Sequence, residues 1–238
     1  MGFNSLKVLV ACEESQRVTE AFRKLGVEAY SCDIQDPSGG HPEWHIKGDA
    51  IPLLNGNCSF ATMDGKEHSV AGKWDIIIAH PPCTDIAVSG AKHFEKKRED
   101  GRQRQGLLLF CAFFEADCDH VLIENPVNIV SGEYVTKWFP DIAEKYGLPR
   151  KPSQIIQPYM FGDPFEKRTC LWLKGLPNLI PTKIVPPPPR QIVKSGKTLP
   201  TWYSNCGGDR RKARSVTFPG IAAAIATQYT EFLKERNV

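Results

Sequence analysis

One cysteine of the eight in this chain stands in a setting that suits a nucleophile. Cys83 follows Pro81 and Pro82, just beyond the apolar run of residues 74–79. Two prolines restrict the backbone and would give the thiol a rigid mount at the exit of a strand. A thiolate near cations or at a helix start is far more reactive than the small, apolar free cysteine of a protein core. The sequence therefore singles out Cys83.

Glu124 is a second candidate, because it comes directly after the apolar residues 121–123. A carboxyl group at the rim of an apolar sheet loses hydration. We expect desolvation to raise the pKa of Glu124 and to let it donate a proton near neutral pH. The alternative is an acid at a helix N-terminus or a solvated charge on the rim.

Two aspartates are candidates for binding a nucleotide. Asp33 ends a predicted strand about twenty residues beyond the first strand exit, where nucleotide-binding α/β folds place an acid that binds ribose. Asp49, between Gly48 and Ala50, could hold an adenine amine. The alternative for each is an ordinary surface aspartate.

Alternating strands and helices would position these residues. The patterns predict strands at residues 7–11, 27–32, 74–79, 120–124, 153–157 and 169–173, and helices at 15–25, 103–116, 133–146 and 219–235. The polar, Lys- and Gly-rich stretch after Cys83 is expected to be a loop. The first strand–helix–strand unit implies a parallel sheet. Ligands bind outside the carboxyl ends of such strands, so one pocket could gather residues 12–15, Asp33, residues 81–83 and Glu124.

Composition narrows the class of protein. The net charge of +3 is too small to indicate a nucleic-acid binder. The cysteines form no C-x-x-C pair, so we expect reduced thiols, no zinc site and no other metal. No apolar run approaches ~18 residues and no signal peptide is recognised, so we expect a cytoplasmic protein without membrane contact and without an obligate protein partner. Cations gather in one stretch that would suit a phosphate backbone or form a solvated face: Lys92, Lys96, Lys97, Arg98, Arg102 and Arg104.

From about Lys7 to Tyr229, the chain resembles the DNA cytosine-5 methyltransferase family, in the short form that phages encode. Residues 75–83, followed by Ser89 and Gly90, are similar to the family's catalytic loop, and residues 121–126 to its Glu-Asn segment. Residues 159–164 with Arg168 resemble the arginine-containing segment. Residues 214–228 resemble the last segment, which in the family packs back on the cofactor domain.

This resemblance implies an α/β fold: a Rossmann-like S-adenosylmethionine-dependent methyltransferase sheet with helices on both faces and a reduced target-recognition region. Residues 1–174 would form the catalytic domain, and residues 175–212 a short Pro- and Gly-rich recognition segment. Residues 213–238 would form a C-terminal helix that packs back on the catalytic domain. A phage-encoded enzyme would act in the host cytoplasm.

The family's chemistry also implies roles for single residues. Cys83 would attack C6 of cytosine, Glu124 would hydrogen-bond N3 and the exocyclic amine, and Arg168 would contact the base. A base in duplex DNA would have to leave the stack. S-adenosylmethionine would be held by the strand-end residues, namely Cys12, Glu13, Glu14, Ser15, Asp33, Asp49 and Pro81.

The chain departs from the family at several places, including Thr84, Pro126 and the register around Arg168, and two departures are larger. The family's first loop is rich in glycine, whereas residues 10–16 contain none. The family's target-recognition region is long, whereas the corresponding stretch of this chain has only about 40 residues, which include the four prolines 186–189.

Three alternatives stay open. The same chemistry could act on a cytosine nucleotide or on single-stranded DNA. An amino-methylating enzyme would carry an aromatic residue after Pro81 and Pro82, where this chain has Cys83. A catalytically inactive DNA-binding or decoy module would explain the missing glycines.

Overall fold

Seven strands form the central sheet of the molecule. The structure is a computed structural model that describes residues 6–187, 189–192, 196, 198–200 and 216–236. The sheet strands are β1 (Lys7–Ala11), β2 (Glu28–Asp33), β3 (His45–Lys47), β6 (Ile76–Ala79), β7 (Val121–Asn125), β8 (Gln154–Ile156) and β9 (Thr169–Lys174). Their order across the sheet is β3-β2-β1-β6-β7-β9-β8.

Five neighbouring strands of this sheet run parallel. β1 pairs in parallel with both β2 and β6, β2 pairs with β3, and β6 pairs with β7. The expected parallel arrangement and the first strand–helix–strand unit are therefore confirmed for this part. β9 is antiparallel to both β7 and β8, so the complete sheet is mixed.

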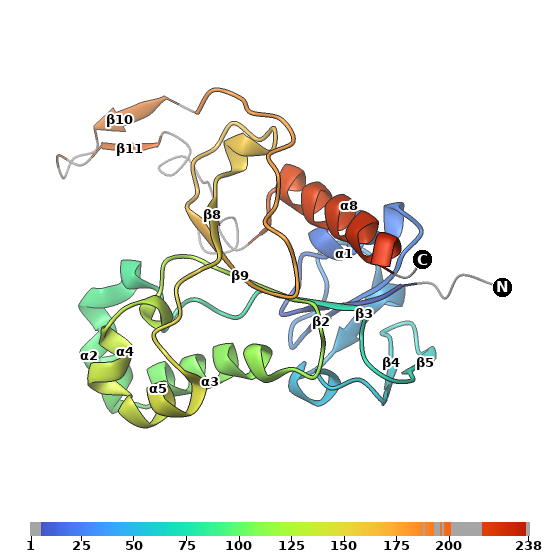
Figure 1. Cartoon of the computed structure of the whole chain (residues 1–238), viewed down its shortest axis with the longest axis horizontal. Helices are drawn as coiled ribbons and strands as arrows, with labels where there is room; N and C mark the ends of the chain where they lie inside the picture. The colour runs from blue at the N-terminus through green and yellow to red at the C-terminus, as the bar shows by residue number, and fades with distance from the viewer. Residues whose placement is uncertain (1–5, 188, 193–195, 197, 201–215, 237–238) are drawn as a thin grey trace.

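Helices cover both faces of the sheet, as expected (Figure 1). Helix α1 (Arg17–Lys24) and helix α8 (Pro219–Arg236) lie on one face, and α3 (Arg102–Glu115), α4 (Tyr134–Trp138) and α5 (Pro140–Tyr146) on the other. Side chains alternate along the buried strands, so Val8 and Ile76 pack in the α1/α8 core, whereas Leu9 and Ile77 pack in the α3 core. Two apolar cores thus hold the sheet rigid from either side.

The region between Cys83 and α3 is helical rather than a loop. A 3-10 helix, η3 (Val88–His93), leads directly into α2 (Phe94–Glu99), and Phe94 is buried. Because this stretch is otherwise polar, the sequence pattern does not predict that Phe94 is buried and holds a helix in place. The single helix expected at residues 133–146 is split between α4 and α5, because the residue before Pro140 disfavours helical backbone.

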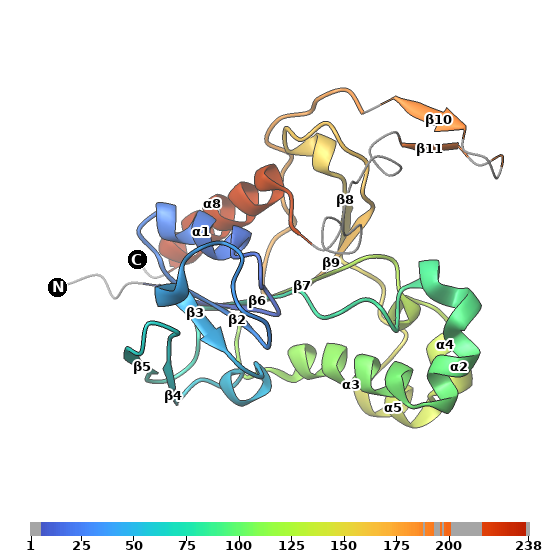
Figure 2. The same ribbon diagram turned by 180° about the vertical axis from the view of Figure 1, so that it is seen from behind.

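Short elements complete the fold. β4 (Cys58–Ala61) and β5 (Glu67–Val70) pair antiparallel, as do β10 (Arg190–Ile192) and β11 (Thr198–Pro200), which extend beyond β8 (Figure 2). The 3-10 helices η1 (Pro42–Trp44), η2 (Ile51–Leu53), η4 (Ile129–Ser131) and η5 (Pro158–Met160) lie in connections. Of the expected recognition segment 175–212, residues 188, 193–195, 197 and 201–212 lie outside the described residues. No helix in the described ranges has the length and apolar character to cross a membrane.

Candidate active site

The parallel strands bring their carboxyl ends to one edge of the sheet. In register, Ala11 lies beside both Cys32 and Ala79, and Ala79 lies beside Ile123. The polar residues that end or follow these strands therefore form a row along the edge: Cys12, Asp33, His80 and Glu124.

The backbone in front of Cys83 is fixed by a buried amide network. The Pro81 carbonyl accepts a hydrogen bond of 2.7 Å from Asn125 Nδ2. Asn125 Oδ1 in turn accepts one of 3.0 Å from Asn128 Nδ2, and Asn128 Oδ1 accepts one from the Val130 amide. The end of β7 thus determines where the two prolines leave β6, and with them where Cys83 begins.

Beyond the thiol, the chain turns tightly. The Cys83 carbonyl accepts hydrogen bonds from the amides of Ile86 and Ala87, at 3.2 and 2.9 Å. The Val88 amide then donates to the Val127 carbonyl. The loop that carries Cys83 is consequently attached to the loop after β7 on both sides of the partly buried thiol.

A buried lysine holds the same loop from α2. Lys97 is only 7% exposed, and its ammonium group donates to the Thr84 carbonyl and lies 3.4 Å from Asp85 Oδ1. Burying an ammonium group is costly unless it is paired and hydrogen-bonded, as it is here. Lys97 is therefore part of the support of the Cys83 loop and not a surface cation.

Other cations of this stretch are also engaged within the chain. The Arg98 guanidinium carbon lies 3.9 Å from the ring centroid of an exposed tryptophan, and Arg102 and Arg104 each pair with an aspartate. Lys92 and Lys96 are exposed. A phosphate backbone would thus meet fewer free charges than the sequence suggests.

Burial raises the pKa of the Cys83 thiol, and the nearby Glu124 carboxylate raises it further. Lys167 and Lys97 oppose both effects but do not reverse them. At neutral pH the thiol is therefore protonated in this state, and it has to lose its proton before it can attack.

Glu124 carries the opposite shift. Burial alone would raise the pKa of its carboxyl group, but Lys167 and a hydrogen bond from His80 outweigh burial and hold the pKa below its usual value. His80 Nδ1 lies 3.1 Å from Glu124 Oε2. The expectation that desolvation makes Glu124 a proton donor near neutrality is therefore wrong for this state, because Lys167 and the His80 hydrogen bond reach it from other segments.

The cation that acts on both Cys83 and Glu124 is Lys167, which is partly buried. Arg168, the predicted base contact, is exposed, and its charge acts on Cys170. Successive residues of an extended segment point to opposite sides, so a shift of one position exchanges their surroundings. The position beside the candidate nucleophile belongs to Lys167.

The loop after β1 turns without glycine. Cys12 and Gln16 have φ angles of 59° and 57°, in the left-handed region that glycine normally occupies. The Gln16 side chain is buried and donates to Ser31 Oγ at 3.1 Å and to the His41 carbonyl at 2.8 Å. Hydrogen bonds of a fixed side chain thus support the left-handed backbone here.

Glu13 points into the protein. Its Oε1 accepts a hydrogen bond of 2.5 Å from the Val18 amide, and its Oε2 accepts bonds from the amide and hydroxyl groups of Thr19. Burial raises the pKa of this carboxyl group, and His80 opposes the rise. The Glu13 side chain caps the start of α1, where an acidic group is favourable, and is engaged there.

Asp33 and Asp49 both lie close enough to Cys12 to influence its thiol electrostatically. Burial raises the pKa of Cys12 to about 12, and both aspartates contribute to the rise. Asp33 Oδ1 accepts a hydrogen bond from the Gln35 amide and Asp49 Oδ1 one from the Ile51 amide. Among the described residues, the second oxygen of each aspartate has no hydrogen bond, so both remain available to a ligand.

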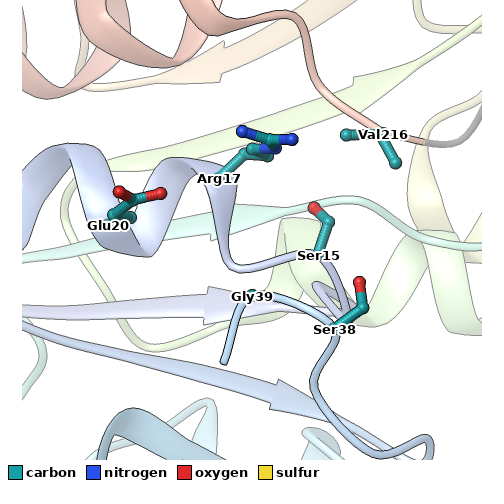
Figure 3. Close-up of a pocket in the computed structure, with 6 residues that line it drawn as sticks. All are labelled: Ser15, Arg17, Glu20, Ser38, Gly39 and Val216. Atoms are coloured by element: carbon teal, nitrogen blue, oxygen red, sulfur yellow. The ribbon is translucent and has the colours of Figure 1, made fainter. Parts of the chain in front are cut away.

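A polar cavity of about 180 Å³ lies beside this loop (Figure 3). It is formed by the start of α1, the loop after β2 and the segment before α8, through Ser15, Arg17, Glu20, Ser38, Gly39 and Val216. Gly39 is required there, because a Cβ atom would lie 2.6 Å from Gln16 Cβ. Of the predicted cofactor residues, Ser15 lines this cavity. The Glu14 carbonyl, next to it, accepts a hydrogen bond from the Ser38 amide.

Three residues at this edge are not identified as candidate site residues from the sequence. His80 and Lys167 contact or act on Glu124, and Ile34, directly after Asp33, is 75% exposed. A polar residue immediately after an apolar strand is the available signal for His80. For Lys167 no signal separates it from its neighbour Arg168.

No protein-family model matches the sequence, and no curated protein does so either. The fold is similar to a solved structure described as a DNA modification methyltransferase encoded within an E. coli prophage, with a TM-score of 0.48 and 16% identity over 76% of this chain. It is also similar to the Entamoeba histolytica methyltransferase EhMeth, with a TM-score of 0.45 and 14% identity over 77% of this chain. The aligned part spans 52% and 58% of those two chains.

Proposed function

We propose that this protein methylates cytosine at C5 in DNA, through a covalent bond between Cys83 and C6 of the base. The observation that carries the proposal is the pairing of Cys83 with Glu124 at one strand edge, with Lys167 acting on both. A fixed thiol, a buried carboxylate and a cation are the groups that this reaction needs.

The chemistry assigns each group a task. Carbon C5 of cytosine is a poor nucleophile, and addition of sulfur to C6 makes it enamine-like. As the Cys83 Sγ–C6 bond forms, the C5=C6 and C4=N3 electron pairs shift and leave negative charge on N3. Glu124 would face N3 and the exocyclic amine. Lys167 offsets the charge that develops beside it.

The edge residues fit the adenosine part of S-adenosylmethionine, which supplies the methyl group when bound. Asp33 and Asp49 each have a carboxylate oxygen without a hydrogen bond among the described residues, and Ile34, directly after Asp33, presents exposed apolar surface. Cys12, Glu14 and Ser15 would contribute backbone contacts from the first loop. Glu13 would act indirectly, through the shape of that loop, because its carboxylate caps α1.

Pro81 also acts through backbone geometry in this proposal. Its carbonyl is already taken by Asn125, so it would contribute ring contacts to the ligand pocket and not a hydrogen bond. Arg168, which is exposed, would contact the substrate from outside the base pocket.

The test is covalent trapping. The purified protein is incubated with tritiated S-adenosylmethionine and DNA that contains 5-fluorocytosine, in which fluorine at C5 blocks release of the enzyme. We expect a labelled protein–DNA adduct that survives denaturing electrophoresis. Cys83→Ser should abolish it, whereas Cys58→Ser, which removes another partly buried thiol on β4, should leave it intact.

Two results would reject the proposal. The first is no adduct on any duplex or single-stranded DNA, with cofactor binding verified by calorimetry. The second is methylation that survives Cys83→Ser, which would revive amino-group methylation. Absence of cofactor binding itself would favour the inactive binding module.

A second candidate is the same chemistry on a cytosine nucleotide or on single-stranded DNA. It is favoured by the engagement of Arg98, Arg102 and Arg104 within the chain, which leaves fewer cations for a duplex backbone. Methyl transfer to a mononucleotide at a rate that duplex DNA does not exceed would support it. A duplex affinity that falls steeply with salt would oppose it.

A further inference from the structure

His80 is hydrogen-bonded to a buried carboxyl group at the candidate site. Its Nδ1 is 3.1 Å from Glu124 Oε2, and the two side chains are 9% and 10% exposed. The His80 amide donates to the Ala11 carbonyl at 2.9 Å, and the buried carboxyl group of Glu13 is influenced electrostatically by His80. His80 thus connects the end of β1 with the end of β7.

Each ring nitrogen has a distinct situation. Glu124 is an acceptor in its ionised form, so Nδ1 carries the proton of that hydrogen bond. Nε2 is buried and has no hydrogen-bond partner among the described residues. A buried, unpaired ring nitrogen is costly, and it is the atom of this ring that is open to a further hydrogen-bond partner or proton.

A metal site does not account for this cluster. The described residues contain no group of three or more His, Cys, Asp or Glu side chains arranged to hold a metal ion. Within the described chain, moreover, the Glu124 carboxylate accepts a hydrogen bond from His80 at Oε2, which leaves Oε1 for a substrate.

We propose that His80 is a positioning residue and proton reservoir, which fixes Glu124 through Oε2 and supplies the proton that Glu124 delivers to N3 of cytosine. This inference rests on the proposed function. Glu124 is ionised at rest, because Lys167 and His80 lower its pKa, so it needs a proton source at the moment of addition. His80 is its immediate neighbour.

The step balances in protons and electrons. Cys83, which has lost its proton to solvent, attacks C6, and the displaced electron pair moves to N3. The ionised Glu124 accepts the Nδ1 proton from the imidazolium form of His80 and passes it to N3, so that the carboxylate ends ionised and His80 ends neutral. After C5 has been substituted, its hydrogen leaves as a proton to solvent, and the electron pair of that bond re-forms C5=C6 as the Cys83 thiolate is expelled. The proton on N3 then returns through Glu124 to His80.

The charged groups around the pair come from several elements. Glu13, in the loop after β1, is influenced electrostatically by His80, and Lys167 acts on Glu124 from the segment before β9. Cys83 lies on the same side as Glu124 and is influenced by it. Any pH dependence therefore belongs to this group of residues together.

The experiment measures the rate of adduct formation with 5-fluorocytosine DNA as a function of pH for the wild type and His80→Gln. The amide of glutamine can still donate to Oε2 but cannot release a proton. We expect the rate at the pH optimum of the wild type to fall by about tenfold or more, and the alkaline decline of the profile to begin at lower pH, because Glu124 becomes the only acid. His120→Gln, at the opposite edge of the sheet, is the matched control and should change neither.

The outcomes separate the two proposals. If the wild type forms an adduct and His80→Gln lowers the rate equally at every pH, His80 has a structural role only and the reservoir is rejected. An unchanged rate and profile reject it as well. If the wild type forms no adduct, the proposed function fails and this inference fails with it.

A second measurement covers the case in which His80→Gln does not fold. The ¹⁵N resonances of the His80 ring are recorded in the wild type and in Glu124→Gln, without substrate. We expect Nδ1 to be protonated in the wild type and its signal to change in Glu124→Gln, with the His120 signals constant. An Nδ1 that carries no proton in the wild type would overturn the proposal.

Discussion

The amide network that fixes Pro81 gives the sharpest stability prediction. Asn125 is 1% exposed, donates to the Pro81 carbonyl at 2.7 Å and accepts from Asn128 Nδ2 at 3.0 Å. Asn125→Ala removes both bonds, each with a net contribution of about 1 kcal/mol, and leaves a buried carbonyl and a buried amide unpaired at about 1 kcal/mol or more each. We expect the free energy of unfolding to fall by about 2–4 kcal/mol.

Urea unfolding followed by circular dichroism measures this loss. With a slope of about 2 kcal/mol per molar urea, the midpoint should fall by roughly 1–2 M. Asn55→Ala is the matched control, because Asn55 also accepts an amide hydrogen bond, from Asp117, but at an exposed position. It should cost about 0.5 kcal/mol or less.

A double-mutant cycle tests the network itself. Asn128→Ala removes the donor to Asn125 and the acceptor of the Val130 amide. The double variant should be more stable than the sum of the single losses predicts, by about 1 kcal/mol, because the two residues share a bond. A loss below about 1 kcal/mol in Asn125→Ala, or strictly additive losses, would refute the reasoning.

Three further predictions concern other contacts. Burial raises the pKa of the Glu13 carboxyl group, so the folded wild type binds more protons than the unfolded chain above the usual glutamate pKa. The stability of the wild type therefore falls as pH rises through this range. Glu13→Gln removes the carboxyl group, so in urea titrations the variant should gain stability relative to the wild type between about pH 5 and 8. A constant difference would contradict this. Lys97→Met should cost about 2 kcal/mol, because Asp85 and a carbonyl lose their partner, whereas the exposed neighbour Lys96→Met should cost nothing measurable. Gly220→Ala should cost about 2–3 kcal/mol in the same assay, because its Cβ would lie 1.9 Å from a backbone carbonyl oxygen, and an unchanged midpoint would show that α8 can shift.

Hydrophobic periodicity predicts most of the sheet. It places the strands β1, β2, β6, β7, β8 and β9 and the helices α1, α3 and α8 within a few residues of their observed bounds, because each buries a regular apolar stripe. It does not predict β3 or the β4–β5 hairpin. β3, β4 and β5 have three or four residues each and include polar residues among the apolar ones, so they lack the continuous apolar run that marks the equally short β6.

For the candidate site, the sequence predicts where the residues lie but not the electrostatic effects on them. Their placement along the strand edge follows from parallel topology, which the sequence pattern implies. Their electrostatics does not, because it depends on partners distant in sequence: His80 is 44 residues from Glu124. Whether Lys167 or Arg168 faces the site depends on the register of the segment before β9, which no local signal determines.

The first loop illustrates how the missing glycines can be replaced. A left-handed conformation costs a residue with a side chain about 1–2 kcal/mol, so Cys12 and Gln16 need compensation. The Cys12 amide donates to the Cys32 carbonyl at 2.7 Å, and the Gln16 side chain donates to Ser31 and His41. Such bonds hold the turn in one shape, whereas glycines would let it vary. Glu13 caps α1 from this same turn and is influenced electrostatically by His80, which is hydrogen-bonded to Glu124. If His80 supplies a proton to Glu124 as proposed, the shape of this glycine-free loop bears on that transfer through Glu13.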